Sequence, residues 1–303
     1  MSGTFVSAAS VEEAVDAMNG GARPVAGGTD LVVGARQGKA PLPEAIVAIH
    51  AIGALRGITG SGGGIRLGAL ATHAEIVAHP VIRERFTALA DASAIVGSHA
   101  TRAQGTIGGN VMNASPAMET GGPLLCFGAT ATLQSASASR EVALADLWSG
   151  PGQTTAAPGE LLVAIDVPEL PAGAGSCYAR LEYRRQMEIA VVGATAVVVL
   201  DGGSVTDARI AITALAPTIH RVAAAETALV GTDGGRAAAE AAAQAAAAAA
   251  APISDVRASA DYRRAMAAVI ARRAIEAAVA RASGASIPVP ASPALHGAVR
   301  GMP

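Results

Sequence analysis

Aromatic residues are scarce in this chain of 303 residues, and blocks of like charge are missing. Phe, Trp and Tyr together make up 2% of the sequence, which argues against a surface that stacks the bases of single-stranded nucleic acid. The formal net charge is −2, from 22 basic and 24 acidic residues without a long run of either sign. Proteins that bind nucleic acid or an anionic membrane usually carry a basic stripe, so we expect neither partner.

Cysteine is also rare, and the two that occur, Cys126 and Cys177, match no metal-binding spacing. An iron–sulfur cluster normally takes four thiolates, so we expect no cluster, and no other metal, in this chain. His73 and His79 are six residues apart and do not share a helical face, which argues against a zinc pair. The first 18 residues lack the basic and apolar regions of a signal peptide, and we expect a cytoplasmic protein.

A long, strongly apolar segment is missing as well. Residues 237–252 are rich in alanine, but Glu240 and Gln244 interrupt them and Pro252 ends them. Alanine favours helices and is only weakly apolar, whereas a membrane-spanning helix needs about 20 mostly apolar residues. We therefore expect this segment to form a helix of a soluble protein and not a membrane span.

Several common catalytic motifs are missing too. Residues 34–39, GARQGK, are one residue short of a phosphate-binding P-loop, and Ala40 stands where Ser or Thr would bind magnesium. No G-x-G-x-x-G follows a strand and opens a helix, so the fingerprint of a dinucleotide-binding Rossmann unit is absent. We identify no catalytic acid, base or nucleophile in this chain.

Two glycine-rich stretches are the features that remain, RPVAGGTDL at residues 23–31 and GTIGGN at residues 105–110. Glycine permits positive φ and lets successive backbone N–H groups converge on an anion. Polar side chains in or near these stretches are those of Thr29, Thr106, Asn110 and Glu119. Two separate sites of this kind suit an extended diphosphate such as FAD, but the spacing alone leaves open a pair of ordinary tight turns.

The order of predicted elements favours two α+β domains. The first 54 residues read as alternating short strands and helices, and three strands joined by short turns, followed by helices, come after residue 173. The tail from residue 284 contains four prolines and no periodic pattern, so we expect it to be extended or tethered to a neighbour. We place a first domain at 1–172, with lobes at about 1–54 and 55–172, a second domain at 173–283 and the tail at 284–303.

Taken together, these stretches resemble the FAD-binding medium subunit of the xanthine dehydrogenase / carbon monoxide dehydrogenase family of molybdenum hydroxylases. PVAGGTDL and GTIGGNVMNASPAME are similar to the two loops that hold the flavin diphosphate, and ELLVAIDVP, YARLEYRRQMEIAVVGA and ARIAITALAPT follow in the family's order. The resemblance implies an α+β fold. A two-lobed FAD-binding domain of the vanillyl-alcohol-oxidase/PCMH type would precede a smaller domain with a three-stranded antiparallel sheet and helices.

The resemblance also implies which residues bind FAD. Those at the diphosphate are Pro24, Val25, Ala26, Gly27, Gly28, Thr29, Asp30 and Leu31, and those of the second loop are Thr106, Gly108, Gly109 and Asn110. Glu119 stands where the family usually has an aspartate that bonds the sugar or ribityl part, and Arg180 matches a basic residue beside the cofactor. Val96 and Leu162 match apolar or backbone contacts, and Ile189 matches a residue over the reactive edge of the ring. For Val96, Leu162 and Ile189, plain core packing is the alternative.

The implied function is electron transfer within a heterotrimer. FAD belongs to this chain, the [2Fe–2S] clusters to a small subunit and the molybdopterin to a large subunit. Electrons would pass from the clusters to the FAD and on to an external acceptor, in a dimer of heterotrimers. Two alternatives stay open, namely a stand-alone FAD-dependent oxidase or reductase of the same fold and a flavin-free scaffold.

Overall fold

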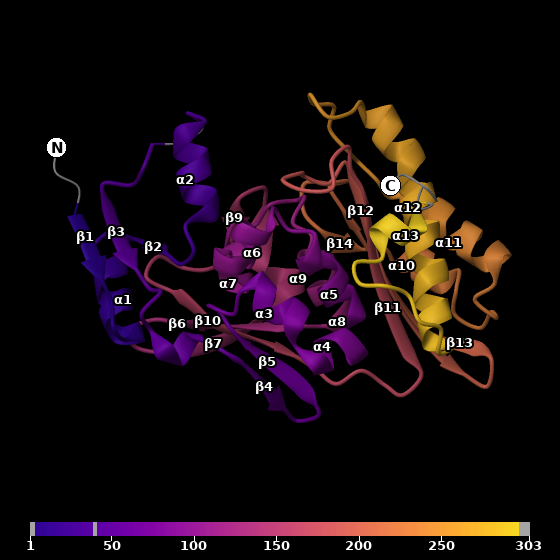
Figure 1. The fold of residues 1–303 in the computed structure, drawn as a ribbon, viewed down its shortest axis with the longest axis horizontal. Coiled ribbons are helices and arrows are strands. Elements are labelled where there is room, and N and C mark those ends of the chain that lie inside the picture. Colours follow the sequence, from indigo (N-terminus) through magenta and orange to yellow (C-terminus); the bar gives the residue numbers. More distant parts are fainter. Residues whose placement is uncertain (1–3, 39–40, 297–303) are drawn as a thin grey trace, which may run out of the picture.

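A computed structural model describes residues 4–38 and 41–296. Three parts follow one another across the view of Figure 1, a first lobe at the N-terminus, a larger second lobe and a C-terminal domain. The chain visits them in sequence order. The division at residues 54/55 and 172/173 stays a prediction.

A three-stranded parallel sheet of order β1-β3-β2 forms the first lobe. Its elements are β1 (Thr4–Ser7), α1 (Val11–Asn19), β2 (Arg23–Val25), α2 (Thr29–Arg36) and β3 (Ala45–Ala48). Helix α1 begins where Ser10 accepts a hydrogen bond from the Glu13 N–H, and it buries Val11, Ala14 and Val15 in the core of the lobe. Helix α2 buries none of its residues and stands out from the lobe (Figure 1).

The second lobe is built on a five-stranded antiparallel sheet of order β4-β5-β10-β6-β7. Its strands are β4 (Ile58–Ser61), β5 (Gly64–Gly68), β6 (Thr130–Gln134), β7 (Ser139–Ala143) and β10 (Leu161–Val167). Its helices are η1 (Gly53–Leu55), α3 (His73–Ala78), α4 (Pro80–Arg85), α5 (Thr87–Ala94), α6 (His99–Gln104), α7 (Ile107–Met112), α8 (Gly121–Phe127) and α9 (Leu144–Leu147), and a small hairpin pairs β8 (Trp148–Gly150) with β9 (Gln153–Thr154). The core contains Leu67, Ile165 and the edge-to-face rings of Phe86 and Phe127, so helices and sheet share one apolar interior.

The C-terminal domain has three long antiparallel strands, β11 (Ala174–Leu181), β12 (Val192–Asp201) and β13 (Ser204–Thr213), with β14 (His220–Arg221) as a two-residue addition at the edge. Gly202 and Gly203 form the two-residue turn between β12 and β13, with φ values of 56° and 83°. The helices are α10 (Ala223–Thr227), α11 (Arg236–Ala248) and α12 (Ala260–Ala282). The α+β prediction, with three antiparallel strands followed by helices, is confirmed.

Both faces of this C-terminal sheet are buried. Cys177, Ala179 and their neighbours pack against α11 and α12, while Tyr178, Val197 and Ala211 lie in the core of the second lobe. This division follows from the strand geometry, because successive side chains point to opposite faces. The sheet therefore joins the two domains through apolar contact.

The tail is irregular over most of its described part, residues 284–296, and packs on the rest of the chain. A short helix, α13 (Ser292–Leu295), lies beside β11, and Ala291 and Ser292 are fully buried. Residues with no periodic pattern can still be ordered when their backbone groups find partners in the rest of the protein, and such partners are present here.

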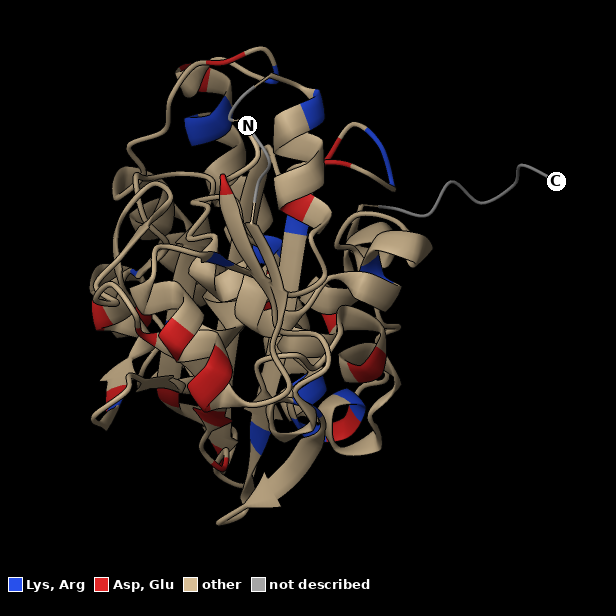
Figure 2. Ribbon diagram, turned by 90° about the vertical axis from the view of Figure 1, so that its left-hand side faces the viewer, with Lys and Arg blue, Asp and Glu red and all other residues tan. Residues whose placement is uncertain are grey.

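Charged residues of both signs are dispersed over the ribbon in Figure 2, with most of the ribbon uncharged. Within residues 4–38 and 41–296, the structure contains no helix with the length and apolarity needed to cross a bilayer. The alanine-rich segment forms α11, whose buried alanines pack against α12. Its helical structure is as predicted.

Candidate functional site

The first glycine stretch is a turn between strand β2 and helix α2. Gly28 has a φ of 66°, in the left-handed region that glycine adopts without strain, and α2 begins directly after it. Among the described residues, no hydrogen-bond partner is found for the N–H groups of Gly27, Gly28 and Thr29. This turn fits the prediction of backbone donors available to an anion, and the helix dipole of α2 adds to it.

The second glycine stretch differs from the predicted turn, because residues 107–112 form helix α7. The Thr106 hydroxyl caps this helix by accepting from the Gly109 N–H at 3.1 Å. The Gly108 N–H donates to the Ala69 carbonyl at 2.9 Å, and a Cβ on Gly108 would lie 2.6 Å from the same oxygen. Gly108 is therefore required by close packing and not by positive φ. The expectation of a second nest of free N–H groups is wrong for this structure, because these donors are already paired.

The fold brings the two stretches into direct contact. A Cβ on Gly27 would overlap the carbonyl oxygen of Gln104, the residue two positions before Thr106. Thr72, which caps α3, forms an isolated β-bridge with Thr106. The first lobe and the second lobe therefore meet where the two glycine stretches meet.

Glu119 and Arg180 extend this line of contacts to the C-terminal domain. Asn110 accepts a hydrogen bond from the Thr120 hydroxyl at 2.6 Å, which places Glu119 next to the second stretch. Arg180, on β11, donates from Nη1 to Glu119 Oε1 at 2.5 Å and from Nε to Glu182 Oε2 at 2.6 Å. Its side chain is fully buried, and its Nη2 has no partner within the described part of the chain.

The segment between β11 and β12, residues 182–191, lies beside Val96. Met187 has a φ of 53°, and its N–H donates to the Gly97 carbonyl at 2.9 Å. The Glu188 carbonyl accepts from Arg180 Nη1 at 3.4 Å. Ile189 is 42% exposed, so it is not a core residue, whereas Val96 is partly buried. The structure thus gathers Val96, Glu119, Arg180 and Ile189 in one region.

Leu162 is placed differently from these residues. It is 3% exposed and belongs to the core of the second lobe. The next residue on β10, Val163, accepts from the Ala69 N–H, and Ala69 in turn accepts from Gly108. Leu162 therefore lies in the strand that supports the second stretch through Ala69, and its side chain has a packing role.

Two cations, Arg102 and Arg180, and two acids, Glu119 and Glu182, set the charge of this region. Burial raises the pKa of Glu119, and the Arg180 guanidinium opposes that shift. Burial lowers the pKa of Arg180, but the carboxylates of Glu119 and Glu182 raise it, and the net direction is upward. Arg102, just before the second stretch, donates to the Val96 carbonyl at 3.0 Å, and its pKa is lowered by burial and by Arg180. Glu119 and Glu182 balance the charge of Arg180, so Arg102 is the cation of this group that has no ion-pair partner among the described residues.

Some residues of this site were missed from the sequence. Arg102 stands four positions before Thr106, close enough to attract notice as a basic residue beside a phosphate-type loop. Gln104 contacts Gly27 through its backbone carbonyl, so its side chain gives no signal in the sequence. Met187 has a positive φ, which a methionine side chain does not predict. Glu182 has a sequence signal only in its i+2 spacing from Arg180, which on a strand puts both on one face.

His73 is a buried residue that contacts the second glycine stretch. It is 1% exposed, its N–H donates to the Gly105 carbonyl at 3.1 Å, and its Nδ1 has no partner in the described residues. Burial, and after it the charge of Arg102, lowers its pKa to about 4. The side chain is therefore neutral in the folded protein over most of the pH range, since protonation would bury an unpaired charge.

We expect His73 to make the chain less stable as the pH falls from 6.5 to 4. The unfolded chain takes up a proton near pH 6.5 and the folded chain only near pH 4, so the unfolded state binds more protons in this window. Above pH 6.5 the contribution is fully present. The wild type should lose about 3 kcal/mol more than His73→Gln between pH 7 and pH 4 in urea unfolding of the apoprotein. His50→Gln, at an exposed position, should follow the wild-type curve. Parallel curves for wild type and His73→Gln would contradict the assignment.

Comparison with known proteins agrees with this architecture. The family model described as the FAD binding domain in molybdopterin dehydrogenase matches residues 1–170, and that of the CO dehydrogenase flavoprotein C-terminal domain matches residues 177–278. The carbon monoxide dehydrogenase medium chain of Afipia carboxidovorans is 34% identical over 261 residues, covering 86% of this chain and 90% of that protein. The xanthine dehydrogenase FAD-binding subunit of Escherichia coli O157:H7 is 28% identical, with coverage of 91% and 96%. A crystal structure of Cu,Mo-CO dehydrogenase superimposes with a TM-score of 0.88 at 33% identity and covers 93% of this chain and 99% of that one.

The fold and the site define a flavoprotein with an FAD-binding domain and a C-terminal domain. The chain is an oxidoreductase subunit of the molybdopterin-dependent dehydrogenase class. It belongs to the family of FAD-binding medium subunits of the xanthine dehydrogenase / carbon monoxide dehydrogenase type. The resemblance drawn from the sequence is thereby confirmed.

Proposed function

We propose that this chain holds one FAD at the junction of its lobes and its C-terminal domain, and passes electrons from the [2Fe–2S] clusters of a small partner subunit to an external acceptor. A large subunit would carry the molybdopterin, and two such heterotrimers would associate in the cytoplasm. The observation that carries the proposal is the first glycine turn, whose N–H groups lack partners in the described residues while it packs on the second stretch.

The residues present fit this cofactor. The turn of residues 24–31 would hold the diphosphate through its N–H groups, and α2 would direct its positive end there. Gly109 is exposed, and Thr106 and Asn110 flank it, so the second stretch would offer a close surface and polar side chains instead of a nest. Glu119 would accept from a hydroxyl, and the unpartnered Arg180 Nη2 would donate. Val96 and Ile189 would contact the ring, with Leu162 behind the second stretch.

FAD, when bound, accepts and releases electrons, and the protein positions it and sets the charge around it. Arg102 and the unpartnered Nη2 of Arg180 would place positive charge beside the ligand, while Glu119 and Glu182 offset part of it. Positive charge next to a ligand favours its more negative, reduced form. The pairing of Arg180 with Glu119 holds the guanidinium in place without a reorganisation step. These residues bind, orient and neutralise charge.

The test compares the isolated chain with the complex that co-purifies with it, both without oxygen in a stopped-flow instrument. Each is mixed with candidate substrates such as purines, N-heterocycles, aldehydes or carbon monoxide. We expect bleaching of the flavin band near about 450 nm in the complex alone, after the iron–sulfur bands are reduced, since this chain has only two cysteines, too few for a cluster.

The cofactor itself is checked first. Heat or acid should release FAD, and not FMN, from the purified chain. Rapid, substrate-specific bleaching of the isolated chain would overturn the subunit proposal and favour a stand-alone FAD-dependent oxidase or reductase. A purified chain without flavin that also takes up none would favour the scaffold.

A further inference from the structure

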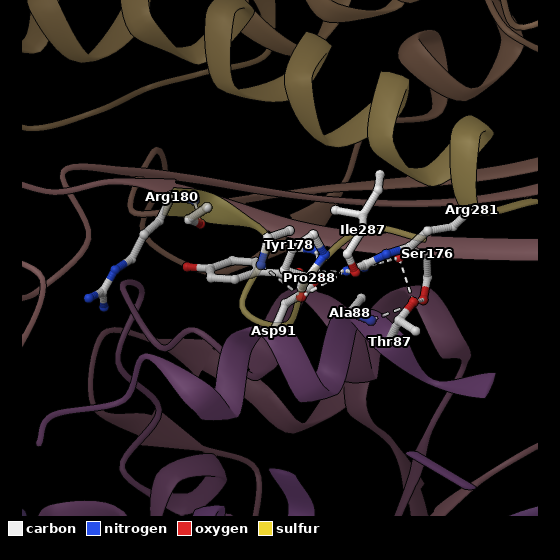
Figure 3. A network of polar contacts seen from close by, with 11 residues as sticks. Thr87, Ala88, Asp91, Ser176, Tyr178, Arg180, Arg281, Ile287 and Pro288 are labelled. Atoms are coloured by element: carbon white, nitrogen blue, oxygen red, sulfur yellow. Dashed lines mark hydrogen bonds and ion pairs between the residues drawn. The ribbon is translucent and has the colours of Figure 1, made fainter. Parts of the chain in front are cut away.

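Strand β11 is an edge strand, and side chains from other elements occupy its outward backbone groups. The Ser176 carbonyl accepts from the Thr87 hydroxyl at 2.6 Å and from Arg281 Nη1 at 2.7 Å. Two residues on, the Tyr178 N–H donates to Asp91 Oδ2 at 3.3 Å. Figure 3 shows these contacts converging on Asp91 and Ser176 from α5 and α12.

The next outward residue of β11 is Arg180, and the tail binds both of its backbone groups. The Arg180 N–H donates to Ser292 Oγ at 3.0 Å, and its carbonyl oxygen lies 2.6 Å from His296 Nε2. An unpaired backbone group at such a buried position would cost free energy, so these two side chains replace a neighbouring strand. The tail is therefore attached to the strand at the residue that contacts Glu119.

The hydrogen bonds of His296 define its tautomer. Arg273 Nη1 lies 2.6 Å from His296 Nδ1, and a guanidinium can only donate. Nδ1 must therefore accept, Nε2 carries the hydrogen, and it donates to the Arg180 carbonyl. The imidazole bridges a donor on α12 and an acceptor on β11.

The start of the tail is fixed by the Asp91–Arg281 ion pair. Asp91 is fully buried and accepts from the Ala291 N–H at 3.0 Å, while Arg281 Nη2 donates to the carbonyls of Ile287 and Pro288 at 3.3 Å each. Ser292 follows Ala291 directly. In Figure 3 the Arg180 side chain extends away from this network. Its Nη1 donates to Glu119 Oε1.

We infer that Ser292 and His296 are positioning residues for Arg180, and that the tail holds the guanidinium in register with Glu119 at the flavin site. The inference rests on the proposed function, because it takes Arg180 as a neighbour of the FAD. Hydrogen bonds to both its N–H and its C=O leave the Arg180 backbone little freedom to rotate, so the direction of its buried side chain is set by the tail.

The test uses the full chain, stripped of flavin and titrated with FAD, with Ser292→Ala and His296→Ala as the tail variants. Each should weaken FAD binding about two- to tenfold, the range expected for one hydrogen bond. Each should also lower the midpoint potential of the flavin, because a misplaced cation stabilises the reduced form less. His296→Gln, which keeps a donor and an acceptor, should restore wild-type values. Ser283→Ala is the matched control, since within the described residues its hydroxyl bonds the Val279 carbonyl of α12 and no other group.

A double-mutant cycle separates positioning from general stability. In a Glu119→Gln/Arg180→Gln background, which removes both charges together, Ser292→Ala should cause no further loss of FAD affinity and no further shift of potential. An equal loss in both backgrounds would overturn the inference, as would wild-type affinity and potential in both tail variants. In those cases the wild type still binds FAD and the proposed function stands. A wild-type chain that binds no FAD would overturn both.

Discussion

Replacing Arg180 by methionine should destabilise the apoprotein by about 3–5 kcal/mol, because the change leaves Glu119 buried without its partner. Glu119 is 7% exposed and Glu182 also loses its charge partner. The measurement is urea unfolding at pH 7, followed by circular dichroism. The double variant Glu119→Gln/Arg180→Met should recover much of the loss, since the uncompensated carboxylate is then gone.

Arg264→Met is the control for this experiment. Arg264 pairs with Asp261 on the surface of α12, and such exposed pairs contribute little. If Arg180→Met unfolds at the urea concentration of the wild type, the buried pair with Glu119 is not formed in solution and the site must be revised.

Gly27→Ala should lower FAD affinity by about a hundredfold or more, because one methyl group would force the two glycine stretches apart. The added Cβ would overlap the Gln104 carbonyl oxygen, which is backbone and cannot turn away. Flavin retained on purification and the Kd for FAD are the measurements.

Gly34→Ala serves as the matched control, since nothing lies within 4 Å of its Cβ position in helix α2 and alanine favours helices. Normal FAD binding by Gly27→Ala would mean that the junction of the two stretches does not carry the diphosphate.

Local signals allowed a good part of the fold to be predicted. The turn at Gly202–Gly203 and the alanine-rich helix α11 follow from backbone preferences within a few residues. The position of β10 between β5 and β6 does not, because β10 pairs with β5 about a hundred residues before it and with β6 about thirty residues before it. The partners of the tail were not predicted either, since its contacts are with Asp91 and Arg180, which no local pattern reveals.

At the site, both glycine stretches were found from the sequence, but the reason for the glycines in the second stretch was predicted wrongly. Gly28 has the positive φ expected of it, whereas Gly108 lies in a helix and is needed because Ala69 is close. The pairing of Glu119 with Arg180 joins two domains. Before the structure, only the resemblance to a family placed both residues beside the same cofactor. Close approach between backbone segments that are distant in the sequence cannot be read from the spacing of residues along the chain.

The apolar contact of the C-terminal sheet with the second lobe decides which motions are open to the molecule. Tyr178, Val197 and Ala211 belong to the interior of the second lobe, so separating these bodies would expose a common core. The core of the first lobe is a separate and smaller cluster, which includes Leu55, Leu70 and Leu161 of the second lobe. A motion that admits or releases a ligand should therefore move the first lobe, where α2 has no buried residues. The part of the site that contains Arg180 should stay in place.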